Sequence, residues 1–260
     1  MDDENRIGWT TRLAAWFGYC FLVLPSIVVI PISFGDSTEL TFPPKNISLF
    51  LYKKFFMDPS WTDPAVQSLI VASFTTAFAL ALGTTAAYGL VRGNFPGKTI
   101  VTVVFLSPMV IPSIVIALAL YLYFSALQIQ GSTLGLVLGH TIISTPFVVV
   151  SAMSGLRNID PTYERAATVM GAGRAYIFYH VTLPLLRPAI IGGGLFAFLI
   201  SFDEVVLSWF VSSARTMTLP VKMYSSIRWE ISPVLAAVSS LLTALSIVVC
   251  LVVAFVQKKE

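Results

Sequence analysis

The sequence has 260 residues, of which 56% are apolar and only 11% are charged, with a formal net charge of +3. Because soluble domains carry about 25% charged residues, this composition excludes an ordinary soluble protein and predicts an integral membrane protein with one helical bundle. The small net charge gives no support for a nucleic-acid partner.

Apolar runs of membrane-spanning length recur along the chain. A helix needs about 20 mainly apolar residues to cross a bilayer. The runs that meet this requirement are residues 13–34, 64–91, 99–124, 133–155, 189–211 and 234–256. We therefore predict an all-α membrane protein, with six transmembrane helices in one domain, 1–260.

The first apolar run, 13–34, follows Arg6 and Arg12 and has a secretory signal as its competing interpretation. It is longer than the usual signal core of about 7 to 15 residues and lacks a small-x-small cleavage site, so a retained span is expected. Cys20 and Cys250 lie in apolar runs, and we interpret both as small buried side chains rather than a disulfide or a metal site.

The third and fourth predicted spans carry residues that interrupt or line a helix. Pro108 and Pro112 lie inside 99–124 and predict a kink or local unwinding. The kink could serve helix packing or a gating movement, and the sequence leaves both roles open. His140, in the fourth span, is expected to form hydrogen bonds within the bundle.

Between the fourth and fifth spans, residues 156–188 form a polar segment, called here the 156–188 loop. Asp160 precedes Pro161, which predicts a helix start, because a carboxylate accepts from unpaired N–H groups and proline suits the first helical position. A short helix to about Met170 should follow.

Two glycines then predict a turn in the 156–188 loop. Gly171 and Gly173 allow the chain to leave the first helix. A second helical piece over residues 175–180 is expected before Leu183 and Pro184 end it. Two short helices joined by a small-residue elbow with flanking charges would suit the docking of a soluble protein.

The 156–188 loop resembles the signature loop of the permease subunits of ATP-binding-cassette (ABC) importers. That pattern is Glu-Ala-Ala, three residues, Gly, nine residues and Ile-x-Leu-Pro. Here Ala166 and Ala167 supply the alanines, Gly171 follows three residues later, and 181–184 reads Val-Thr-Leu-Pro. Arg165 stands where the family has glutamate, one place after Glu164.

The resemblance implies the six-helix transmembrane bundle of type I importer permeases, with a cytoplasmic coupling helix over 163–174 that fits a cleft in a separate ATPase subunit. The coupling residues would be Glu164, Arg165, Ala166, Ala167, Gly171, Ala172, Gly173 and Arg174. The competing interpretation is an amphipathic helix lying on the lipid surface without a partner.

The distribution of basic residues predicts the orientation. Six spans place both termini on one side of the membrane. Ten of the 16 lysines and arginines fall on that side, together with the 156–188 loop. The positive-inside rule therefore puts both termini and the loop in the cytoplasm.

The fifth predicted span contains adjacent carboxylates. A charge near the bilayer centre costs about 2.5 to 3.5 kcal/mol on insertion scales, so the pair is not expected to face lipid. On a continuous helix Ser201, Glu204 and Ser208 share one face, which would line a substrate path, while Asp203 points toward a neighbouring helix. A structural ion pair, or a cap at a helix break, is the alternative to contact with a passing cation.

The segments 201–206, 218–220 and 224–233 look like the polyamine branch of the importer permeases. The resemblance implies import of spermidine or putrescine, with opines, phosphonates and other small solutes as alternatives. It also implies a bacterial inner-membrane location, a second homologous permease, and two copies of an ATP-binding subunit. An extracytoplasmic solute-binding protein would dock on the loops at 35–63 and 212–232, and transport would proceed by alternating access.

The sequence contains no motif that would support an enzymatic activity. There is no HExxH, CxxC or nucleophile elbow, and Gly97-Lys98-Thr99 lacks the first glycine of a phosphate-binding loop, where Arg92 stands. We therefore expect no catalytic residue, no cofactor and no metal site, with ATP hydrolysis in a partner subunit. A proton-coupled secondary transporter using Asp203 or Glu204, and a structural membrane scaffold, are the rival hypotheses.

Overall fold

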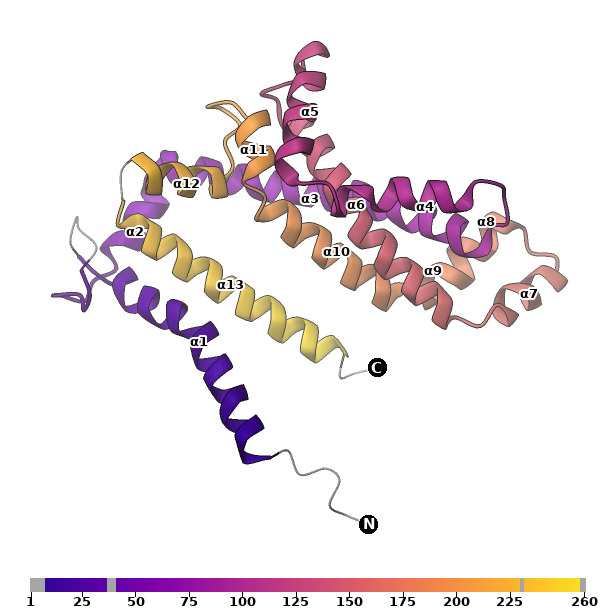
Figure 1. The fold of residues 1–260 in the computed structure, drawn as a ribbon, viewed down its shortest axis with the longest axis horizontal. Helices are drawn as coiled ribbons and strands as arrows, with labels where there is room; N and C mark the ends of the chain where they lie inside the picture. The colour runs from indigo at the N-terminus through magenta and orange to yellow at the C-terminus, as the bar shows by residue number, and fades with distance from the viewer. Residues whose placement is uncertain (1–7, 37–40, 230–231, 258–260) are drawn as a thin grey trace. The chain divides into compact units, whose positions relative to one another are not determined.

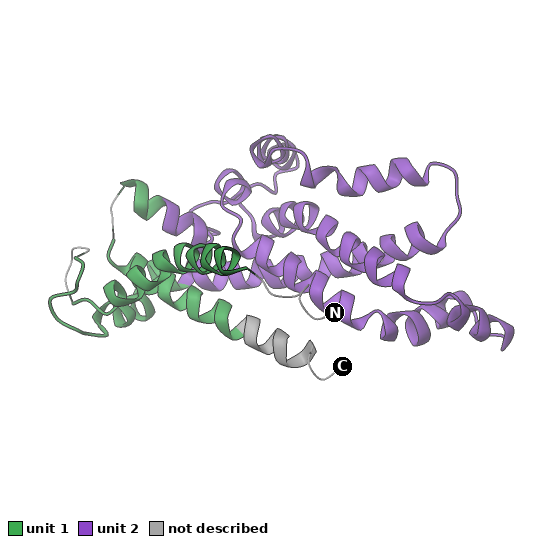
Figure 2. Ribbon diagram, turned by 60° about the horizontal axis from the view of Figure 1, so that its bottom comes forward, with its two compact units in different colours: residues 1–62, 225–260 green, residues 63–224 purple. Residues whose placement is uncertain are grey.

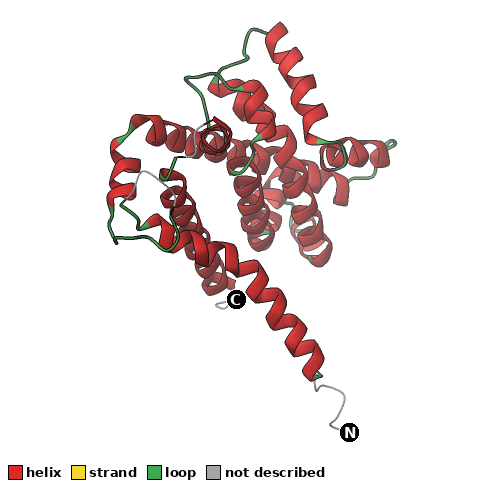
Figure 3. Cartoon of the chain, turned by 60° about the vertical axis from the view of Figure 1, so that its left-hand side comes forward, coloured by secondary structure: helices red, strands yellow, loops and turns green. Residues whose placement is uncertain are grey.

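The computed structural model describes residues 8–36, 41–229 and 232–257, with side chains up to residue 248 in the last helix. The described residues form helices joined by short connections, apart from one isolated bridge between Gly35 and Ile47 (Figures 1 and 3). The prediction of an all-α fold is confirmed. The chain divides into two compact units, residues 1–62 with 225–260 (unit 1) and residues 63–224 (unit 2), coloured separately in Figure 2.

Unit 1 contains the first and last helices and a short helix that the sequence analysis assigned to a loop. These helices are α1 (Trp9–Ser33), α2 (Phe50–Met57) and α13 (Val234–Gln257). The Tyr52 hydroxyl on α2 lies 2.6 Å from the Ser33 hydroxyl and donates to the Ser240 hydroxyl at 3.1 Å. These hydroxyl contacts connect α2 to both long helices of the unit.

One expectation for unit 1 is revised, and others concern residues that the structure does not describe. Cys20 is exposed on α1, not buried, because α1 packs along α13 and leaves most of its circumference open. The open side carries apolar residues such as Phe17 and Phe21, as expected for a helix in lipid. The side chain of Cys250, and residues 37–40 and 230–231 of the proposed binding-protein loops, lie outside the described residues.

Unit 2 is organised around α6 (Thr133–Asn158), which packs along α10 (Arg187–Phe202) and lies against α3 (Pro59–Arg92). Small residues allow these helices to approach closely. A Cβ added to Gly155 would lie 2.5 Å from the Ala189 Cβ, and one added to Gly83 would lie 2.8 Å from the Val148 Cβ. This packing buries the middle of α6, and it fixes the position from which the 156–188 loop starts.

The third predicted span is two helices joined at a sharp bend. α4 (Lys98–Leu106) leads into a 3-10 turn (Ser107–Met109), and α5 (Ser113–Ala126) leaves at an angle of 100°. Pro108 lies in the turn and Pro112 precedes α5 with an extended backbone, so neither supplies an amide to a continuous helix. The predicted interruption is found, but it breaks the segment rather than bending it gently.

The fifth predicted span is also not one helix. It follows the short helices α7 (Thr162–Val169), α8 (Arg174–Ile177) and α9 (Leu183–Leu185), with a π turn (Phe178–Thr182) between the last two. The helical path from Arg174 to Leu185 meets α10 at 77°. α10 ends at Phe202, α11 (Val206–Val211) follows, and α12 (Leu219–Trp229) was not predicted.

By length and hydropathy, α1, α3 and α6 can each cross a membrane. If each of the two bent pairs forms one span, the number rises to five. The part of α13 whose side chains are described, Val234–Val248, is too short to be counted by itself. These numbers of possible spans apply to the described residues, and the count of six spans stays a prediction.

Candidate functional site

The 156–188 loop begins with the helix start that its sequence predicts. The Thr162 amide donates to Asp160 Oδ1 at 2.8 Å, directly before α7. This hydrogen bond stabilises the carboxylate and so lowers the pKa of Asp160 below its usual value. α7 ends at Val169, within one residue of the expected position.

The elbow after α7 has the hydrogen bonds of a Schellman motif. Gly171 has a φ of +87°, its amide donates to the Thr168 carbonyl, and the Ala172 amide donates to the Ala167 carbonyl at 3.0 Å. This φ is one that residues with a Cβ rarely adopt. No atom lies within 4 Å of a Cβ added to Gly171 or Gly173, so open space adjoins the elbow.

The second helical piece continues further than expected. It runs through α8 and the π turn into α9, and the chain bends at Leu186 rather than at Leu183 and Pro184. Pro184 lies in the first turn of α9, where a helix does not need its missing N–H. The π turn, which is wider than an α-helical turn, joins α8 to α9.

Glu164 is turned toward the body of unit 2. Its carboxylate lies 3.2 Å from Arg92 Nε and accepts a hydrogen bond from the Thr182 hydroxyl at 2.9 Å. Arg92 also donates from Nη2 to the Ile159 carbonyl at 2.9 Å. The side chains of Arg92 and Glu164 are only 17% and 14% exposed. Glu164 therefore fastens α7 to the end of α3 and to the π turn, and the sequence analysis did not identify Arg92 or Thr182 as its partners.

The opposite side of the loop is open. Arg165, Ala166 and Arg174 are exposed, while Ala167 is buried. A hollow of about 640 Å³ adjoins the elbow, and its lining residues are Ala167, Met170, Gly171, Ala172, Gly173, Tyr176, His180 and Val181. The rings of Tyr176 and His180 stack, with centroids 4.1 Å apart. The candidate coupling residues thus share this surface, except Glu164, which faces inward; Ala167 is buried at the wall of the hollow.

The second candidate region is the polar sequence at the end of α10. Asp203 is exposed at the C-terminal end of that helix, and Glu204 is partly exposed. The Leu207 amide donates to Glu204 Oε1 at 2.8 Å, in the first turn of α11. The expected continuous helix face through Ser201, Glu204 and Ser208 is wrong, because the helix stops at Phe202 and Glu204 caps the next one.

His140 connects the two sides of this break. It is fully buried on α6, with Nδ1 2.9 Å from the Ser201 hydroxyl and Nε2 2.9 Å from the Ser208 hydroxyl. The expectation that His140 forms hydrogen bonds within the bundle is confirmed. Ser201 and Ser208 are brought together by this contact and are themselves buried, whereas Asp203 is exposed.

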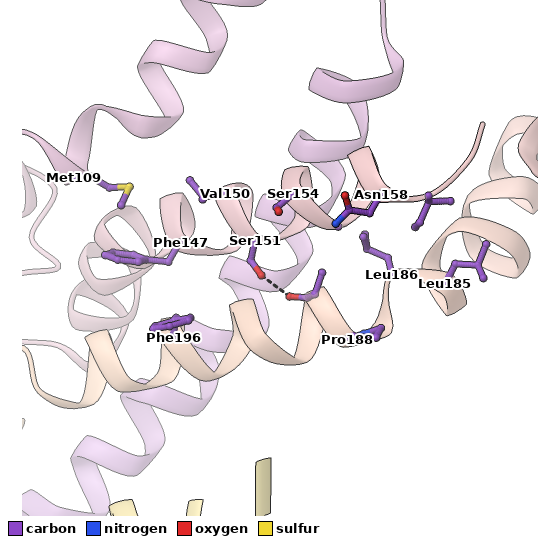
Figure 4. A pocket seen from close by; sticks show the side chains of 13 residues that line it. Met109, Phe147, Val150, Ser151, Ser154, Asn158, Leu185, Leu186, Pro188 and Phe196 are labelled. Carbon is purple, nitrogen blue, oxygen red and sulfur yellow. Dashed lines mark hydrogen bonds between the residues drawn. The ribbon is translucent and has the colours of Figure 1, made fainter. Parts of the chain in front are cut away.

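A cavity of about 690 Å³ lies along α6 and α10 and was not foreseen from the sequence (Figure 4). Aromatic and aliphatic side chains such as Phe147 and Phe196 form most of its wall, with Ser154 and Asn158 as polar members. The Ser151 hydroxyl donates to the Ala189 carbonyl at 2.7 Å. The wall carries no acidic side chain.

Sequence comparison relates the chain to transport proteins. Residues 79–260 match the family described as "binding-protein-dependent transport system inner membrane component". The chain is 33% identical over 230 residues to the spermidine/putrescine transport system permease protein PotC of Escherichia coli (strain K12), which covers 88% of this chain and 87% of the relative. It is 34% identical over 232 residues to the putrescine transport system permease protein PotI of the same strain, with 86% and 82% covered.

A relative that is named for another substrate also matches. The molybdenum transport system permease protein ModB of Escherichia coli (strain K12) is 34% identical over 187 residues, which cover 66% of this chain and 81% of the relative. Among solved structures, a bacterial ABC transporter involved in the import of the acidic polysaccharide alginate superimposes with a TM-score of 0.75. That match is 15% identical and covers 96% of this chain and 94% of the other, so it shows a shared fold.

Proposed function

The chain belongs to the family of binding-protein-dependent transport system inner membrane components, and we propose that it carries a polyamine into the cytoplasm by alternating access. Membership makes it a permease subunit of an ABC importer, which is a transport component and not an enzyme. Such a subunit works with an ATP-binding subunit and a solute-binding protein.

The observation that carries the choice of substrate is the extent of the match to two polyamine permeases. PotC and PotI are named for spermidine and putrescine transport and align with more than four fifths of this chain. ModB, named for molybdenum transport, aligns with two thirds of it. If the exposed carboxylate of Asp203 and the partly exposed one of Glu204 line the substrate path, they would favour a cationic solute.

We further propose that residues 163–174 dock the ATP-binding subunit. The elbow at Gly171 is exposed, open space adjoins it, and the hollow beside it can receive a side chain from a partner. Glu164 and Arg92 fasten α7 to α3 from the inner side. A force applied to α7 would therefore pass directly to a helix long enough to cross the membrane.

The complete importer would contain a second homologous permease and two copies of the ATP-binding subunit, with both termini of this chain in the cytoplasm. The excess of basic residues on the side of the 156–188 loop supports this orientation. The solute-binding protein would dock from the other side, on the loops at 35–63 and 212–232. ATP-driven closure of the two ATP-binding subunits would then switch the permeases between inward-open and outward-open states.

Uptake into proteoliposomes tests this proposal. The assembled importer is reconstituted with ATP inside the vesicles and with the binding protein and labelled putrescine or spermidine outside. We expect uptake that requires ATP and the binding protein and is indifferent to a proton gradient. Uptake driven by a proton gradient without ATP would support the secondary transporter, and ATP-dependent uptake of another solute alone would retain the importer and reject the polyamine.

A further inference from the structure

Glu164 is the one acidic residue of α7, and its side chain does not lie on the docking surface of the 156–188 loop. Glu164 points inward, where Arg92 and Thr182 hold it. Asp160 precedes α7 and is held by the Thr162 amide. The negative charges near the elbow are thus engaged by this chain's own groups.

The positive charges on the same surface have no such partners. Arg165 and Arg174 are exposed, and neither forms a hydrogen bond or a close ion pair with any residue that the structure describes. The pKa of Asp160 is lowered mainly by the Thr162 amide and, at longer range, by Arg165. Successive residues on a helix point about 100° apart, so the inward direction of Glu164 turns Arg165 away from Arg92. Arg165 lies in α7 and Arg174 is the first residue of α8, the two helices that the elbow joins (Figure 1).

Exposed apolar side chains complete the surface. Val169 and Met170 are 88% and 82% exposed, and Met170 also lines the hollow beside the elbow. Methionine, tyrosine and arginine are enriched in protein interfaces. A concave surface with these residues fits a protein with a protruding side chain better than the smooth surface of a membrane.

Burial of two arginines in an interface is costly unless the partner neutralises them. Because Glu164 is already paired, this chain offers no carboxylate for that purpose within α7 or α8. We propose that the cleft of the ATP-binding subunit that receives the elbow presents carboxylates to Arg165 and Arg174. The inference rests on the proposed docking function, and it specifies the charge of the partner surface.

The test measures the affinity of the ATP-binding subunit for the permease assembly held in lipid nanodiscs, at low and at high salt. Arg165→Glu and Arg174→Glu should each weaken binding at least about tenfold at low salt, because a repulsive charge replaces an attractive one. The wild-type affinity should fall as salt rises, since salt screens exposed pairs. Arg157→Glu reverses an exposed charge on the same loop before α7 and should change the affinity less than about twofold.

Three further variants of this chain, and one of the partner, keep the test decisive. Gly171→Val disturbs the elbow without altering charge, so it reports on the docking site itself. Arg165→Gln and Arg174→Gln remove charge without repulsion and should weaken binding by a smaller factor. Replacing an acidic residue of the partner cleft by lysine should restore binding to Arg165→Glu or Arg174→Glu.

The outcomes separate the two claims. If Gly171→Val abolishes binding while Arg165→Glu and Arg174→Glu bind as tightly as wild type, the docking site stands and the acidic cleft is refuted. If none of these variants alters binding, the docking function fails together with the inference. Weaker attachment of the charge-reversed variants to anionic vesicles, with unchanged affinity for the ATP-binding subunit, would assign the arginines to lipid and also refute the inference.

Discussion

Arg92 at the end of α3 and Glu164 in α7 form an ion pair, with 3.2 Å between Nε and Oε2, across 72 residues of sequence. The pair fixes the short helix of the 156–188 loop to a helix long enough to cross a membrane. Movement of α7 by a docked partner would therefore reach α3 without passing through a flexible connection.

Arg92→Met should loosen α7 while leaving the rest of unit 2 intact. It removes a charged hydrogen-bond partner of Glu164, an interaction worth about 1.5 to 3 kcal/mol. Amide hydrogen exchange in residues 162–169 should accelerate about 10- to 100-fold, as measured by mass spectrometry. Arg157→Met, at an exposed arginine, is the matched control. Unchanged exchange in α7 would show that the pair contributes little to its position.

Gly171→Val should damage the elbow through the backbone. The residue has a φ of +87°, which costs a side chain with a Cβ about 1 to 2 kcal/mol, although open space surrounds it. The variant should insert into the membrane but lose its ATP-binding subunit during co-purification. Gly89→Ala, also at an uncrowded glycine but with an ordinary φ, should retain the subunit. Equal retention by both variants would contradict the assignment of the docking site.

His140→Leu should destabilise the protein, because it leaves the buried hydroxyls of Ser201 and Ser208 without their partner. An unsatisfied buried polar group costs about 1 to 3 kcal/mol, whereas replacing all partners by apolar groups is nearly neutral. The triple variant with Ser201→Ala and Ser208→Ala should therefore be more stable than His140→Leu alone in thermal unfolding. A triple variant less stable than the single one would argue against this network.

Asp203→Asn and Glu204→Gln separate transport from structure. Glutamine can still accept from the Leu207 amide, so Glu204→Gln should keep the cap of α11 and remove only the charge. If the carboxylates contact a cationic solute, both variants should reduce uptake severalfold, with assembly and basal ATP hydrolysis unchanged. Undiminished uptake by either variant would assign that residue to structure.

The start of α7 should respond to acid. The Thr162 amide lowers the pKa of Asp160, so the carboxylate stabilises the folded loop above its unfolded pKa of about 3.9. That stabilisation is lost as the pH falls through the lower, folded value. Hydrogen-exchange protection of α7 should therefore stay constant from pH 7 to about 4 and decline below it. Asp160→Ala should lower protection at neutral pH and make the decline in acid smaller.

Local signals made much of the 156–188 loop predictable. Asp160 with Pro161 marks a helix start, and Gly171 occupies the position after a helix that favours glycine, so both depend on neighbouring residues alone. The pairing of Glu164 with Arg92 was missed because it depends on how α7 folds back onto α3. No local pattern reports such a contact.

The break after Phe202 was foreseen only as an alternative, a cap at a helix break, which the structure confirms for Glu204. Its sequence remains apolar on both sides, and the helical spacing of Ser201, Glu204 and Ser208 favoured one continuous face. The structure instead uses Glu204 as a cap, and His140 as a bridge from a distant helix. The same limit applies to α2, whose buried Leu51 and Phe55 lie in a stretch with enough charge to be assigned to a loop.

Substrate-stimulated ATP hydrolysis by the reconstituted importer tests the central claim most directly. The binding protein is supplied empty, or loaded with putrescine, spermidine, a neutral solute or an anionic solute. We predict stimulation by the polyamine-loaded forms alone, and its loss in a complex that carries Gly171→Val. Stimulation by a different solute and by neither polyamine would contradict the proposed substrate, and full stimulation in the Gly171→Val complex would contradict coupling through the 156–188 loop.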